Sequence, residues 1–203
     1  MSGFARLIAA AADLFVAEAQ RPDAPAPDLR ATAAALRLVQ PGEPTRAAVR
    51  VPVCVQLDRA IALAGSTPAE PIARGLEIVA PRLAWKRNPN YGTDPHLLAN
   101  YGYAEIASPS GLFATERCAF GFLLLGPDTL SAPHAHPAME LYYVVGGTAH
   151  WWKEGEDWCE RPPGSLIHHP SGIAHAMRTG AQPLLALYTW LGDLATPSRL
   201  VRV

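Results

Sequence analysis

Neither sign of charge is in excess in this sequence. Its 203 residues include 17 basic and 18 acidic side chains, for a formal net charge of −1, and only Lys86 and Lys153 are lysines. Proteins that bind nucleic acid or an acidic membrane surface usually carry a basic patch, because contacts with phosphate dominate such binding. We therefore expect neither a nucleic acid nor a membrane among the partners.

Cysteines are equally sparse, and long apolar runs are missing. A disulfide framework needs paired cysteines, and the chain has three scattered ones without a C-x-x-C pair, namely Cys54, Cys118 and Cys159. No stretch approaches the roughly 20 apolar residues of a transmembrane helix. Acidic residues interrupt residues 1–20, which argues against a signal peptide. Together these absences predict a cytoplasmic protein.

The N-terminal part, residues 1–80, has the periodicity of helices. Apolar residues recur at helical spacing over 4–19, with Ser2 as a possible N-cap. Prolines at 22, 25 and 27 then break the chain. Further helices are predicted over 29–39, 53–64 and 68–80, the last with Thr67 as its cap and Pro68 at its first position. We expect these helices to form an extension beside a second unit.

The composition changes near residue 81. Residues 81–100 are rich in proline, asparagine, glycine and aromatics and are predicted to be a loop. The alternative is a lid over the mouth of the barrel, formed by His96 with Tyr91, Tyr101 and Tyr103. Residues 101–203 favour short strands separated by turns, which is typical of a sandwich or barrel. The predicted strands cover 103–107, 118–125, 141–145, 148–153, 158–161, 165–168, 174–178 and 184–191.

Two segments of this β portion combine histidines with a carboxylate. In the first, His134 and His136 are two residues apart, and Glu140 and Tyr142 follow at even spacing. Alternate residues of a strand share a face, so these four side chains would point into one cavity. The second segment runs from Gly164 through a Pro-Ser-Gly turn to His175. Three imidazoles and one carboxylate suit a divalent transition metal, without selecting among Fe, Mn, Ni, Co, Cu and Zn.

The spacing of the two segments resembles the two motifs of the cupin family. The first motif reads H-x-H, three residues, E, six residues, G from His134 to Gly147, and the second reads G, five residues, P-x-G, two residues, H from Gly164 to His175. The resemblance implies a double-stranded β-helix, or jelly-roll barrel, that is mainly β, with an α-helical N-terminal extension. It also implies that the metal ligands are His134, His136, Glu140 and His175.

Three further features stand out, namely the Glu-Leu-Tyr-Tyr run at 140–143, the Trp-Leu-Gly-Asp run at 190–193 and the helical extension. Together they carry a narrower resemblance, to the cupin dimethylsulfoniopropionate (DMSP) lyases and their relatives. It implies a metal-dependent β-elimination that converts DMSP to acrylate and dimethyl sulfide. Tyr142 would be the base. The sulfonium would be held by aromatic faces, for which the candidates are Trp190 with Tyr188 or Tyr143.

One position departs from the lyase pattern. The family carries a tyrosine three residues before the first histidine, and this chain has Ser131 there, which keeps a hydroxyl but loses the ring. Another small carboxylate could therefore be the substrate. The alternatives are a cupin dioxygenase, an isomerase and a non-catalytic metal-binding cupin. Cupins often form homodimers, so a homodimer is expected. The additional His169, near the second motif, is interpreted as a surface or core residue, with a position next to the metal ligands as the alternative.

Overall fold

Helices dominate the N-terminal part of the chain, as predicted. The computed structural model describes residues 1–44, 46–92 and 94–202, and its helices here are α1 (Gly3–Glu18), α2 (Ala26–Arg37), η1 (Pro52–Gln56), α3 (Leu57–Ala62), α4 (Glu70–Val79) and η2 (Ala80–Arg82). Ser2 caps α1, because its Oγ accepts a hydrogen bond from the Ala5 N–H at 3.2 Å. The prediction for this first helix is confirmed.

The predicted start of α4 is wrong by two residues. The helix begins at Glu70, and Pro71 rather than Pro68 occupies its first turn. Thr67 accepts from the Ala69 N–H at 3.2 Å, and its Oγ donates to the Ala64 carbonyl at 2.8 Å. The threonine therefore closes the turn that leads into the helix rather than capping the helix itself.

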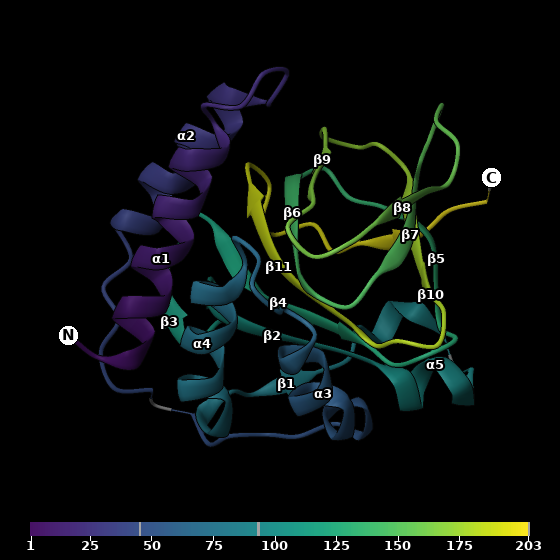
Figure 1. Ribbon diagram of the computed structural model, residues 1–203, viewed down its shortest axis with the longest axis horizontal. Coiled ribbons are helices and arrows are strands. Elements are labelled where there is room, and N and C mark those ends of the chain that lie inside the picture. The colour runs from purple at the N-terminus through teal and green to yellow at the C-terminus, as the bar shows by residue number, and fades with distance from the viewer. Residues whose placement is uncertain (45, 93, 203) are drawn as a thin grey trace.

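The β portion forms two facing sheets (Figure 1). The seven-stranded sheet has the order β1-β2-β4-β11-β6-β9, with β3 beside β2, and the five-stranded sheet has the order β12-β5-β10-β7-β8. Three pairs of consecutive strands are hydrogen-bonded to each other, namely β1 with β2, β2 with β3 and β7 with β8. The other consecutive strands lie in different sheets or are not neighbours, as in a jelly roll. The bounds are β1 (Trp85–Lys86), β2 (Tyr101–Ser108), β3 (Phe113–Ala114), β4 (Ala119–Leu125), β5 (Leu130–Ala135), β6 (Met139–Gly146), β7 (Ala149–Lys153), β8 (Cys159–Arg161), β9 (Leu166–His169), β10 (His175–Thr179), β11 (Leu184–Leu191) and β12 (Arg199–Leu200).

The large sheet has two different faces, and both are buried. In Figure 1, helices α1, α2 and α4 lie on one side of it and the small sheet on the other. On β6, Leu141, Tyr143 and Val145 belong to the core shared with the helices, whereas Tyr142 and Val144 belong to the core between the sheets. This alternation is the period of a strand. The fold is therefore the cupin jelly roll with a helical N-terminal extension that the sequence predicts.

The loop predicted over 81–100 contains regular elements, among them a short strand and a short helix. Trp85 and Lys86 form β1, paired with Ala104 and Tyr103, and a further helix, α5 (Pro95–Asn100), follows. A two-residue strand and a six-residue helix are too short to show periodicity, which is why the sequence pattern missed both. His96 is the second residue of α5, and its Nε2 lies 3.0 Å from the Asp128 carbonyl oxygen, away from the barrel cavity.

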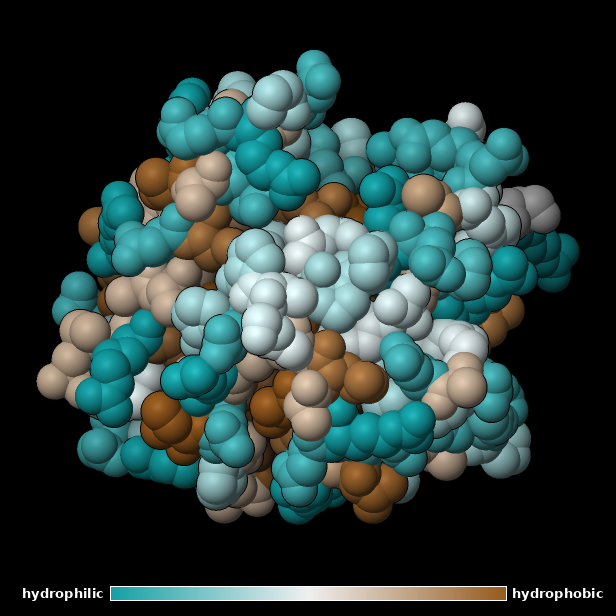
Figure 2. Space-filling model, in the orientation of Figure 1, coloured by the Kyte–Doolittle hydropathy of each residue, from teal (hydrophilic) through white to brown (hydrophobic). Residues whose placement is uncertain are grey.

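The surface offers no long apolar feature in the view of Figure 2. Hydrophobic residues on this face form separate small patches among hydrophilic ones. Within 1–44, 46–92 and 94–202, none of the helices combines the length and apolarity of a membrane span.

Candidate metal centre

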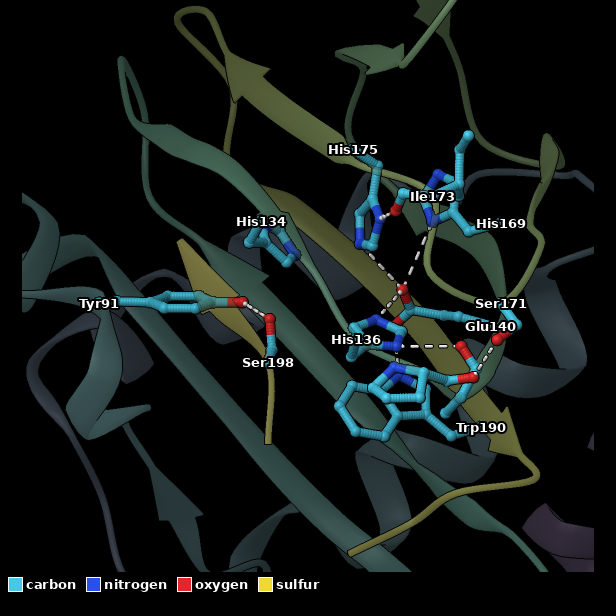
Figure 3. A network of polar contacts seen from close by, with 12 residues as sticks. Tyr91, His134, His136, Glu140, His169, Ser171, Ile173, His175, Trp190 and Ser198 are labelled. Atoms are coloured by element: carbon cyan, nitrogen blue, oxygen red, sulfur yellow. Dashed lines mark hydrogen bonds and ion pairs between the residues drawn. The ribbon is translucent and has the colours of Figure 1, made fainter. Parts of the chain in front are cut away.

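The four predicted ligands come from three strands and the turn between two of them (Figure 3). His134 lies on β5, His136 just after it, Glu140 on β6 and His175 at the start of β10. His134 and His175 are cross-strand partners. All four side chains are at most 5% exposed. Buried polar groups need partners, so their convergence inside the barrel calls for a compensating interaction.

Three of these side chains bring their ligand atoms close together. The ligand atoms of His136, Glu140 and His175 all lie within 4.8 Å of one another. Glu140 Oε2 is 3.1 Å from both His136 Nε2 and His175 Nε2. His134 is outside this group, although its ring packs against that of His175 with 4.3 Å between centroids.

Each of the three histidines is oriented by a backbone carbonyl. The Nδ1 atoms of His134, His136 and His175 lie 2.8, 3.0 and 3.1 Å from the carbonyl oxygens of residues 132, 138 and 173. A carbonyl only accepts, so Nδ1 must carry a proton and donate, and Nε2 is the nitrogen left to face a metal ion. Metal-binding histidines are typically held in this way. The donor set therefore fits a divalent transition metal.

A further histidine, His169, lies beside this cluster. It is 1% exposed, its ring stacks on that of His175 at 3.9 Å between centroids, and its Nδ1 is 3.4 Å from Glu140 Oε2. The surface interpretation is wrong, and the alternative position next to the proposed ligands agrees with these contacts. In the structure His169 is the cross-strand partner of Glu140, with His169 on β9 and Glu140 on β6.

Trp190 contacts the cluster through both its ring and its nitrogen. Its Nε1–H donates to Glu140 Oε1 at 2.6 Å, and its ring stacks on His136 with 4.0 Å between centroids. The indole therefore fixes one carboxylate oxygen and leaves Oε2 to the histidines. The sequence had offered Trp190 only as an aromatic face.

Burial and neighbouring charges shift the pKa values of the site's histidines and of Glu140. Burial, with help from His175, lowers the pKa of His134 to about 3 and that of His169 to about 4. Burial also lowers the pKa of His136, but the charge and hydrogen bond of Glu140 outweigh it and raise that pKa. For Glu140, burial raises the pKa, and the contacts with His136, His169 and His175 more than reverse this. In the metal-free protein His134 and His169 are therefore neutral, and His136 and Glu140 form an ion pair.

A cavity of about 240 Å³ opens onto this cluster. Tyr142, Tyr188 and Trp190 line it together with His134, His136 and Glu140. Burial, followed by the charge of Glu140, raises the pKa of Tyr142 well above its usual value. Further rings come from outside the motifs, and the sequence had mentioned these only in connection with a lid: Tyr91, Tyr101 and Tyr103.

Comparison with known proteins identifies the family. The sequence model of the dimethylsulfoniopropionate lyase family matches residues 29–186. The chain belongs to this family. A putative DMSP lyase, DddL, of Cereibacter sphaeroides is 36% identical over 70% of the chain, and the DMSP lyase DddQ of Ruegeria pomeroyi is 40% identical over 45% of it. These matches span 60% and 45% of the two relatives' own lengths.

Solved structures of DMSP lyases share the fold of this family member over nearly its whole length. One, described with the lyases RdDddP and RnDddQII, is 27% identical with a TM-score of 0.76 and covers 98% of each chain. That of DddQ from Ruegeria pomeroyi has a TM-score of 0.79 at 24% identity, covering 98% of this chain and 96% of the other.

Two predicted substrate contacts lie elsewhere in this DMSP lyase family member. Tyr143 is fully buried in the core under the helices, on the face of β6 opposite to Tyr142, so it is not a wall of the cavity. Tyr143 is three residues after Glu140, and strand residues separated by an odd number of positions face opposite sides of the sheet. Ser131 is also buried, pairs with Met177 and does not line the cavity.

Proposed function

We propose that this protein is a metal-dependent lyase that cleaves DMSP to acrylate and dimethyl sulfide by β-elimination. The observation that carries the proposal is the set of carbonyl-anchored histidines around Glu140 at the floor of a cavity lined by tyrosines. Membership in the DMSP lyase family supports the same reaction. DMSP is the substrate named for the relatives described above, and its assignment to this protein is part of the proposal.

His136, Glu140 and His175, with His134 beside them, would hold one divalent transition metal ion, drawn from Fe, Mn, Ni, Co, Cu and Zn. When bound, such an ion supplies a Lewis acid that acidifies the proton next to a carboxylate and favours the phenolate of a nearby tyrosine. The protein's contribution is to keep three Nε2 lone pairs directed inward and the site shielded from water.

Tyr142 is the proposed base. It lies two residues after Glu140 on the same face of β6 and lines the cavity. Its phenolate oxygen takes the proton from the carbon next to the substrate carboxylate. The electron pair of that bond forms the double bond of acrylate, and the carbon–sulfur bond breaks with its electrons going to sulfur. Dimethyl sulfide leaves uncharged, and the proton remains on Tyr142 until solvent removes it.

The sulfonium has no hydrogen-bond donor, so aromatic faces suit it. Tyr188 lies 6.2 Å from Tyr142 and 6.5 Å from Tyr103 between ring centroids, which places three rings around one part of the cavity. Trp190 contributes less to this wall because one face of its indole is covered by His136. We assign the cation to the tyrosines and Trp190 to the positioning of Glu140.

The loss of the family tyrosine at Ser131 does not argue for another reaction. Tyr91, supplied by the segment before β2, packs on His134 with 5.2 Å between centroids and hydrogen-bonds Ser198 Oγ at 3.1 Å. This ring lies beside a proposed ligand and lines the cavity. A homodimer in the cytoplasm remains a prediction.

The experiment is anaerobic incubation with DMSP of protein loaded separately with each candidate metal. Acrylate and dimethyl sulfide released in equal amounts are the expected result. Turnover that requires oxygen would instead indicate the dioxygenase, and a rearranged product without release of sulfide would indicate the isomerase. Stoichiometric metal binding with no turnover of DMSP would contradict the proposed substrate.

A further inference from the structure

The cavity wall carries a charge pair in addition to the metal centre. Lys86 of β1 and Glu105 of β2 both line the cavity, and Lys86 Nζ contacts Glu105 Oε2 at 2.5 Å. Ser110 Oγ donates to the same oxygen at 2.9 Å. Among the described residues, Glu105 Oε1 has no hydrogen-bond partner. The carboxylate is therefore held in place through one oxygen, while the other remains available.

Glu105 lies in one row with the proposed reaction centre. Across the large sheet, Glu105 pairs with Gly121, Gly121 with Tyr188, and Tyr188 with Tyr142. Gly121 has no side chain, and a Cβ there would lie 3.1 Å from the Tyr188 ring. No side chain of β4 therefore separates the carboxylate from Tyr188. After burial, the charge of Glu105 is the next largest cause that raises the pKa of Tyr188.

The protein already places a cation of its own at this corner. The Lys86 ammonium lies 5.2 Å from the centroid of the Tyr103 ring as well as against Glu105. An aromatic face beside a carboxylate is the combination that binds sulfonium and quaternary ammonium groups. The Lys86 side chain is 39% exposed, so its end can move into solvent when another cation enters.

We propose that Glu105 is the counter-charge for the cationic end of the substrate, so that the cavity selects zwitterionic small carboxylates over ordinary anionic ones. This inference rests on the proposed function, which directs the carboxylate end towards the metal centre. Lys86 neutralises Glu105 while the cavity is empty and competes with the incoming cation. Glu105 is thus a specificity residue that takes no part in proton transfer.

The test compares two ligands of the same shape that differ in one charge. β-Alanine betaine carries a quaternary ammonium group, which is a poor leaving group, and 4,4-dimethylpentanoate has carbon in place of the nitrogen. Dissociation constants are measured by calorimetry on the full chain loaded with Zn²⁺, which is redox-inert. The variants are Glu105→Gln and Lys86→Met. Glu43→Gln, which breaks an exposed ion pair with Arg82 outside the cavity, is the matched control.

We expect the wild type to bind the betaine about tenfold more tightly than the isostere, as one effective charge interaction would give. Glu105→Gln should remove this preference by weakening the betaine alone. Lys86→Met should tighten the betaine severalfold, because the competing ammonium is gone. Glu43→Gln should change neither constant. No preference in the wild type, or an equal loss for both ligands in Glu105→Gln, would overturn the proposal.

Two further results separate this inference from the lyase proposal. If Lys86→Met weakens both ligands equally, Lys86 binds their shared carboxylate and the assigned roles are wrong. DMSP turnover is measured on the same wild-type preparation. A preference for the betaine without DMSP turnover would contradict the lyase and leave the role of Glu105 standing, whereas turnover without the preference would do the reverse.

Discussion

At the residue scale, the candidate metal centre consists of side chains that each use one polar atom in a hydrogen bond to the protein and leave the other for a metal ion. Three histidines donate Nδ1–H to carbonyls, and Glu140 gives Oε1 to Trp190. This commitment determines which atoms face the shared point before any ion arrives. The sequence motifs predicted the ligands, but they could not show these partners, because the carbonyls of residues 132, 138 and 173 take their positions only in the fold.

Trp190→Phe tests the indole hydrogen bond. The variant keeps an aromatic ring against His136 and removes only the donor to Glu140 Oε1. We expect the affinity for metal to fall by about tenfold, as for other changes to groups that orient a ligand. Competition with a chromophoric chelator measures it. Unchanged affinity would show that the indole serves the substrate alone.

The lowered pKa values of His134 and His169 predict acid sensitivity of the metal-free protein. Unfolded histidine titrates near pH 6.5, whereas these two titrate at about 3 and about 4 when folded. Between those values the unfolded chain binds more protons, so falling pH favours unfolding. The raised pKa of His136 opposes part of this effect. We expect the free energy of unfolding to drop by about 1 kcal/mol per pH unit below pH 6.5.

Denaturant unfolding of metal-free protein between pH 6.5 and 4.5 measures this slope. His169→Gln should make the slope shallower, and His96→Gln, a change outside the site, should leave it as in the wild type. A slope that His169→Gln does not alter would mean that this imidazole is not held neutral in the folded protein.

At the element scale, sequence patterns predicted long elements well and short ones poorly. The helix predicted over 4–19 is observed at Gly3–Glu18, and the strand predicted over 184–191 is observed as such. Both have enough residues for a period to show. Strands β1 and β12 have only two residues each. They form because β1 pairs with β2 and β12 pairs with β5, which are distant in the sequence. For the same reason the contributions of Tyr91 and Lys86 to the cavity could not be predicted.

Gly146→Ala tests how closely helix α3 approaches the sheet. A Cβ at Gly146, at the end of β6, would overlap the carbonyl oxygen of Ala60 in α3. Because that oxygen is backbone, the helix must shift. We expect a loss of about 2 kcal/mol or more, seen as a drop of several degrees in Tm. Gly180→Ala, with open space around its Cβ, is the control. Equal Tm values for the two variants would contradict this packing.

At the scale of the whole molecule, the helices and the candidate metal centre lie on opposite faces of one sheet. The outer face of the large sheet is buried by α1, α2 and α4, and its inner face carries Glu140, Tyr142 and Trp190. The change in composition near residue 81 predicted a helical extension beside a β unit, but not which face of a sheet the helices would cover. Family membership and the jelly-roll fold, both expected from the two motifs, are confirmed by the comparisons.

Metal removal should therefore destabilise the whole fold. An ion bound only by the folded state raises stability by mass action, and this site joins β5, β6 and β10. We expect a chelator to lower Tm by several degrees in the wild type, and to have little effect in His136→Ala, which lacks one ligand. An equal chelator effect in both proteins would contradict metal binding at this site.

The central claim is that Tyr142 performs proton abstraction at a metal centre built by His136 and its partners. The most direct test measures metal content and DMSP turnover together in wild type, Tyr142→Phe and His136→Ala. The account predicts that Tyr142→Phe keeps its metal and loses at least about a hundredfold in turnover, whereas His136→Ala loses both. Turnover that persists in metal-loaded Tyr142→Phe would contradict the claim and require another base.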